Sequence, residues 1–195
     1  MKKVLLLLAD GFEILEASAF IDVIGWNLVD GDGSTQLFSC GLRREIKSSF
    51  KQRFVVDYLI DEIDTTKFDA LAIPGGFQEF DYYKDAYHDD FLKLIRMFNA
   101  ERKTIASVCV GALPIARSGV LTNRRATTYT KNRLRAEELL SYNVNVIDEP
   151  IVIDCNVITS WNPSTATDVA FLLLEQLTSK SQSDFIREIM GFKLK

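Results

Sequence analysis

Three short, largely apolar runs constrain the fold of this chain most strongly. They are Val4–Leu8, Ala70–Ile73 and Thr104–Val108, and each is followed at once by a turn. An apolar run of this length is typical of a strand that is covered on both faces of a sheet. Segments with apolar residues at helical spacing lie between them, notably 13–29 and 89–100. This alternation predicts an α/β fold with a doubly wound, mostly parallel sheet sandwiched by helices.

The rest of the chain continues the same pattern. Further strands are predicted at 36–41, 53–59, 145–147, 151–154 and 157–159, and further helices after Cys109, at 133–140, from Pro163 to 177 and near the C-terminus. The sequence has no internal repeat or low-complexity linker, and its 195 residues are close to the length of a typical domain. We therefore expect one domain spanning residues 1–195.

Charge and hydropathy exclude several classes of partner. The net charge is −4, whereas proteins that bind nucleic acid or anionic membranes need an excess of Lys and Arg. The apolar run from Val4 to Ala9 is shorter than a signal peptide requires, and nothing else is long enough to cross a membrane. We expect a cytoplasmic protein that binds neither nucleic acid nor membranes.

Cys109 is the strongest candidate for a reactive group. It stands between a predicted strand and a predicted helix, with the small residues Ser107 and Gly111 two positions to either side. This is the pattern of a nucleophile elbow, whose tight turn needs small flanking residues. N–H groups and the dipole at the start of the following helix favour a thiolate. The alternative is an inert buried cysteine, since free Cys is often buried.

Two other loops should lie beside Cys109, because ligands bind at the carboxyl ends of the strands in such sheets. Pro74-Gly75-Gly76 follows one buried strand, and its amides could form an oxyanion hole with that of Val110. Glu13 and Glu16 follow another strand and lie on one face of the predicted helix. The alternative is that they have no chemical role, since the helix dipole makes acidic residues common in a first helical turn.

Other polar groups give weaker signals. Cys40, Cys109 and Cys155 are too widely spaced for a Cys-type zinc site, and a disulfide framework is not expected. The single histidine, His88, lies among scattered carboxylates that define no coordination geometry, so we expect no metal. A basic cluster at 124–135 reads as a solvated face, with binding of an anionic substrate as the alternative.

Taken together, these segments resemble the DJ-1/PfpI superfamily, and its DJ-1 branch more closely. The resemblance covers nearly the whole chain and depends on the order of its segments: 5–9 with 11–16, 73–76, 106–111 with Leu121, and 159–160 before Pro163. It implies a flavodoxin-like fold, as in class I glutamine amidotransferases, and a homodimer.

The resemblance also implies roles for individual residues. Cys109 matches the nucleophile, and Glu16 matches a protonated acid that hydrogen-bonds it. The backbone N–H groups that form the oxyanion hole of the family correspond to those of Gly75, Gly76 and Val110. Arg53 matches an arginine near the active site of DJ-1-like dimers, or is an ordinary strand-edge residue.

Two positions depart from the family pattern. Val110 replaces the His that follows the nucleophile in PfpI-type enzymes, which disfavours a Cys-His peptidase. Tyr129 replaces the His of a Thr-Thr-His segment, so a phenol stands where an imidazole could move protons near neutral pH.

Three functions follow as hypotheses. The first is a glyoxalase- or deglycase-type enzyme without cofactor, in which Cys109 attacks a small carbonyl substrate. The second is a redox-sensing stress protein or chaperone, in which an oxidant modifies Cys109. The third is a cysteine peptidase or amidase, which needs an imidazole near the sulfur.

Overall fold

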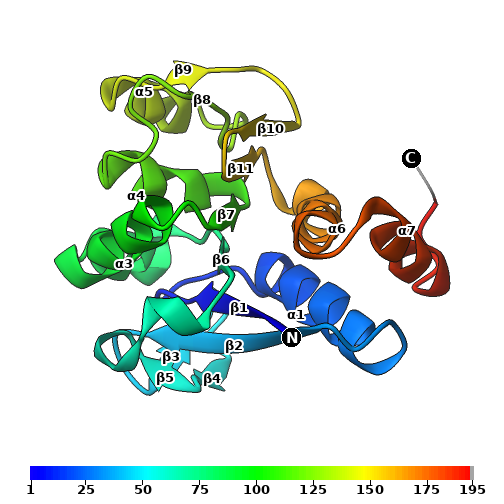
Figure 1. The fold of residues 1–195 in the computed structure, drawn as a ribbon. Coiled ribbons are helices and arrows are strands. Elements are labelled where there is room, and N and C mark those ends of the chain that lie inside the picture. Colours follow the sequence, from blue (N-terminus) through cyan, green and yellow to red (C-terminus); the bar gives the residue numbers. More distant parts are fainter. Residues whose placement is uncertain (194–195) are drawn as a thin grey trace.

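A seven-stranded sheet forms the centre of the structure, a computed structural model that describes residues 1–193 (Figure 1). Its strand order is β10-β11-β7-β6-β1-β2-β5, and all neighbours are parallel except the edge strand β10, which is antiparallel to β11. The bounds are β1 Lys2–Leu7, β2 Thr35–Gly41, β5 Tyr58–Leu59, β6 Ala70–Ile73, β7 Thr104–Ser107, β10 Ile151–Asp154 and β11 Val157–Ser160.

Helices cover both faces of this sheet. One layer contains α1, α6 and α7, which contact one another, and α3 and α4 lie on the opposite side (Figure 1). The bounds are α1 Ile14–Val29, α2 Tyr82–Ala86, α3 Asp89–Ala100, α4 Ala112–Arg117, α5 Arg133–Ser141, α6 Ala166–Leu177 and α7 Lys180–Ile189. Within residues 1–193, no helix has the length and apolar character needed to span a bilayer. The doubly wound, flavodoxin-like α/β fold predicted from the sequence is confirmed.

Burial explains why the apolar runs form the inner strands. From Val4 to Leu7 no side chain of β1 is exposed, and the same holds for every residue of β6. Because β1, β6 and β7 are adjacent and parallel, their carboxyl ends meet at one edge of the sheet. There the first loop pairs with the loop after β6, since Glu13 N–H donates to the Gly75 carbonyl oxygen at 2.9 Å.

The segment 53–59 differs from the single strand predicted. Arg53–Val55 forms β4, which pairs with β3 (Glu45–Lys47) in a separate hairpin, and only β5 joins the main sheet. The chain turns between them because the Asp57 carboxylate accepts bonds from both the backbone N–H and the hydroxyl of Ser39. A further two-stranded sheet pairs β8 (Arg125–Ala126) with β9 (Asn145–Val146).

Candidate active site

Cys109 lies in a tight turn between β7 and α4. It opens a short 3-10 segment, Cys109–Gly111, and its φ is 56°, a left-handed conformation that costs a non-glycine residue ~1–2 kcal/mol. The turn is close to its neighbours, because a Cβ on Gly111 would lie 2.6 Å from the Ile73 carbonyl oxygen. The Thr128 hydroxyl donates to the Cys109 carbonyl oxygen at 3.0 Å and holds the turn. The strain and the bracing contact together fix the direction of the thiol.

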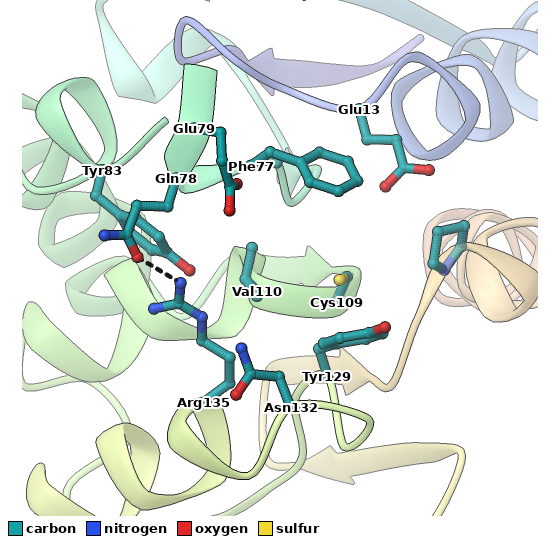
Figure 2. Close-up of a pocket in the computed structure, with 12 residues that line it drawn as sticks. Glu13, Phe77, Gln78, Glu79, Tyr83, Cys109, Val110, Tyr129, Asn132 and Arg135 are labelled. Carbon is teal, nitrogen blue, oxygen red and sulfur yellow. Dashed lines mark hydrogen bonds between the residues drawn. The ribbon is translucent and has the colours of Figure 1, made fainter. Parts of the chain in front are cut away.

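The thiol lies on the wall of a cavity of about 300 Å³ (Figure 2). Only 7% of Cys109 is exposed, but its sulfur points into the open space. A small molecule can therefore reach the sulfur, which is otherwise shielded from solvent. The lining residues are Glu13, Gly76, Phe77, Gln78, Glu79, Tyr83, Cys109, Val110, Tyr129, Asn132, Arg135 and Pro163.

Glu16, in the first turn of α1, is fully buried behind this wall. Its Oε2 accepts the Gly75 N–H at 2.6 Å, and its Oε1 has no hydrogen-bond partner among the described residues. A Cβ placed on Gly75 would lie 2.9 Å from Oε2, 3.0 Å from the Val110 nitrogen and 3.1 Å from the Cys109 Cβ. The carboxyl, the Cys109 side chain and the Val110 amide thus converge on Gly75, where a side chain would press on all three.

Burial dominates the electrostatics of this pair. It raises the pKa of Glu16 to about 8, with help from the charge of Glu13 and against the Gly75 hydrogen bond. Burial also raises the pKa of Cys109, with a further contribution from Glu16, while the Val110 N–H acts in the opposite direction. The raised pKa of Glu16 favours its protonated form near neutral pH. Desolvation is the largest influence on the thiol, and it opposes the thiolate that the start of the following helix was expected to favour.

The backbone donors predicted for an oxyanion hole divide into two groups. Gly76 and Val110 line the cavity beside the sulfur. The Gly75 N–H instead points at Glu16, so this amide holds the acid and is not offered to a ligand.

Of the remaining candidates, only Tyr129 shares the cavity with the thiol. Tyr129 lines the cavity below Cys109 (Figure 2). Arg53 lies on the exposed hairpin, paired with Glu45 at 3.2 Å, and faces a different hollow, so this chain does not bring it to the thiol. The exposed His88 caps α3 by accepting the Asp90 N–H and is not part of the cavity lining.

Sequence reasoning missed part of the far end of the cavity. Tyr83, Asn132 and Arg135 line it, and they belong to segments far from the strand–loop motifs. Of these only Arg135 was marked, within the basic cluster at 124–135, for which binding of an anionic substrate was the alternative interpretation. Phe77 and Gln78 directly follow the double glycine, which is a signal that could have drawn attention to them. Across residues 1–193, no group of three or more His, Cys, Asp or Glu side chains is arranged to hold a metal ion.

Comparison with known proteins gives a match to the DJ-1/PfpI family model over residues 2–176. Protein DJ-1 homolog A of Arabidopsis thaliana is 26% identical over 190 residues, which are 97% of this chain and 46% of the relative. The chain thus spans less than half the length of that relative. A Pyrococcus abyssi protein named as a deglycase is 26% identical over 161 residues, 83% of this chain and 90% of its own.

The fold has close counterparts among solved structures. The crystal structure of Drosophila melanogaster DJ-1beta superimposes with a TM-score of 0.86 and covers 99% of both chains, at 23% sequence identity. At this identity the likeness concerns the fold alone.

Proposed function

The chain belongs to the DJ-1/PfpI family, and from this premise we propose that Cys109 is the nucleophile of a deglycase- or glyoxalase-type enzyme acting on small reactive carbonyl compounds. One observation carries the proposal. A strained cysteine faces a cavity of about 300 Å³ while a buried carboxyl lies directly behind it. Deglycase-named relatives support the same class of chemistry.

The first step is addition of the thiol to the carbonyl. When the pair has lost one proton, the Glu16 carboxylate accepts the proton of the thiol, and the sulfur forms a bond to the carbonyl carbon. The electron pair of the C=O π bond moves to oxygen, where the amides of Gly76 and Val110 stabilise the negative charge. Glu16 then returns the proton to that oxygen. The product is a hemithioacetal, and no other reactant is consumed.

A pH profile tests the assignment of Glu16. Because Glu16 must be ionised to accept the thiol proton, turnover of methylglyoxal rises with pH through about 8, the pKa of Glu16. Glu16→Gln lacks this rise and has at most a residual rate.

A cysteine series tests the nucleophile. Cys109→Ser abolishes methylglyoxal turnover, whereas Cys155→Ser, which alters an exposed thiol at another turn, keeps the full rate. Unchanged turnover in the Cys109 variant would falsify the proposal.

Oxidation of Cys109 is the second candidate function. The thiol would reduce a peroxide to water and become a sulfenic acid, and a second peroxide would give a sulfinic acid. The unpartnered Glu16 Oε1 supports this, since a protonated carboxyl can donate to an oxidised sulfur. Intact-mass spectrometry after mild peroxide treatment tests it: Cys109 must oxidise before Cys40 and Cys155.

The peptidase hypothesis has the least support. It needs an imidazole near the sulfur, and the single histidine of the sequence lies outside the lining of the cavity. The homodimer and the cytoplasmic location stay predictions. Light scattering on the purified chain measures the first, and imaging of the tagged protein in cells measures the second.

A further inference from the structure

The end of the cavity away from Cys109 collects hydrogen-bond donors. Tyr83 from α2, Asn132 at the start of α5 and Arg135 within α5 direct their polar groups toward the same part of the space (Figure 2). Each of them can donate, and each is held so that its donor faces the cavity. The evidence for this differs among the three residues.

The Tyr83 hydroxyl is buried and has no hydrogen-bond partner among the described residues. Leaving such a group unpaired costs about 1–3 kcal/mol. Its ring is fixed, because the Arg135 guanidinium stacks on it with 4.7 Å between the guanidinium carbon and the ring centroid. A ligand atom that accepts a hydrogen bond would satisfy the hydroxyl without moving the protein.

Asn132 is oriented by its role as a helix cap. Its Oδ1 accepts the Leu134 N–H at 3.1 Å, so the acceptor end of the amide is occupied by the backbone of α5. The NH₂ group, which can only donate, is left for the cavity.

Arg135 supplies the positive charge. Its side chain is only 18% exposed, and it is held by Gln78 Oε1 at 2.8 Å and by Glu138 Oε2 at 3.2 Å. Glu138 does not line the cavity, whereas the guanidinium does. The other carboxylates of the lining, Glu13 and Glu79, come from the opposite wall (Figure 2). Arg135 is therefore the one cation among the lining residues, and it shares its charge with Glu138.

We propose that this cluster, Tyr83, Asn132 and Arg135, binds the single carboxylate of a substrate whose carbonyl group meets Cys109, so that the substrate is a short aldehyde acid. The inference rests on the proposed function for the role of Cys109. The Tyr83 hydroxyl, the Asn132 NH₂ group and the guanidinium of Arg135, which also donates to Gln78 and Glu138, together match the lone pairs of a carboxylate. The volume agrees, since about 300 Å³ equals roughly ten water molecules of ≈ 30 Å³ each, more than a three-carbon carbonyl compound fills.

Binding of simple carboxylates tests the cluster without any chemistry at the thiol. Calorimetry compares pentanoate with its neutral amide, pentanamide, on the complete chain. Pentanoate should bind more tightly than pentanamide, and Arg135→Met should weaken pentanoate about tenfold or more. Arg133→Met is the matched control: it removes the same charge from the same helix, but Arg133 is 90% exposed and outside the cavity, so affinity should be unchanged.

A second variant guards against a folding defect in Arg135→Met. Tyr83→Phe removes only a hydroxyl that has no partner among the described residues, so the melting temperature of the variant should not fall while pentanoate binding weakens. Equal binding of pentanoate and pentanamide, or unchanged pentanoate affinity in Tyr83→Phe and in folded Arg135→Met, overturns the carboxylate site.

An aldehyde experiment separates the two proposals. Glutaric semialdehyde and its methyl ester are compared for addition to Cys109 by mass spectrometry. Both proposals are supported if the acid adds to Cys109 faster than the ester does and if this difference disappears in Arg135→Met. If pentanoate binds but no aldehyde adds, the carboxylate site stands and the proposed function fails. If acid and ester add equally fast and pentanoate does not bind, the proposed function stands and the carboxylate site fails.

Discussion

Replacing Glu16 with Gln should change how the stability of the protein depends on pH. The Glu16 carboxyl is fully buried, and its pKa rises from the 4.5 of a free glutamate to about 8. A carboxyl with a raised pKa in the folded state binds its proton more tightly there than in the unfolded chain. Its ionisation therefore opposes folding, and the protein loses stability as pH rises from about 4.5 through 8.

The size of this loss follows from the two pKa values. At about 1.4 kcal/mol for each pKa unit, the difference between 4.5 and about 8 corresponds to a loss of about 5 kcal/mol by the upper end of this range. Glutamine has the same shape, can still accept the Gly75 N–H and does not ionise. The unfolding free energy of the variant should therefore rise relative to that of the wild type as pH increases.

Urea unfolding measured at several pH values between 5 and 8 provides the test. The difference in unfolding free energy between wild type and Glu16→Gln isolates this one carboxyl, because the other titrating groups are common to both proteins. A difference that stays constant across this pH range would refute the reasoning, since it would mean that Glu16 ionises at its ordinary pKa.

Three further changes probe the frame of the site. Gly75→Ala should destabilise the chain by about 1–3 kcal/mol in urea unfolding and abolish turnover, because its Cβ would press on Glu16 and Cys109; a fully active, equally stable variant would contradict this. Cys109→Gly should be about 1 kcal/mol more stable than Cys109→Ala, because only glycine adopts a φ of 56° without strain; equal melting temperatures would count against a strained turn. Asp85→Asn should cost about 2 kcal/mol, because the amide offers Arg43 one acceptor oxygen in place of two and no charge; an unchanged urea midpoint would show that the contact with Arg43 does not stabilise the fold.

The parts of the fold that the sequence predicted are those in which local pattern and burial agree. The residues of β1 and β6 are apolar because both faces of the sheet are covered, so their composition alone marks them as inner strands. The β3–β4 hairpin and α2 lack such a signal. They are short, and contacts with distant segments hold them, such as the bond from the Gly11 N–H to the Lys47 carbonyl oxygen.

The same distinction applies to the site. Cys109 and Glu16 are marked by motifs at the ends of strands, whereas Arg135 reaches the cavity through a contact with Gln78, 57 residues away in the sequence. For the charge of the thiol, sequence reasoning considered only the helix dipole, because a dipole can be inferred locally. The desolvation that outweighs it depends on how the whole chain packs around the sulfur.

The placement of the reactive groups on three adjacent inner strands has a consequence for heat inactivation. Glu16, Gly75 and Cys109 each follow a different strand of one sheet, and those strands are joined by parallel hydrogen-bond ladders. Separation of these strands would therefore disperse all three groups at once. The turnover proposed for Cys109 and the tertiary structure should thus be lost over the same temperature interval, which parallel measurements of methylglyoxal turnover and tertiary structure would check.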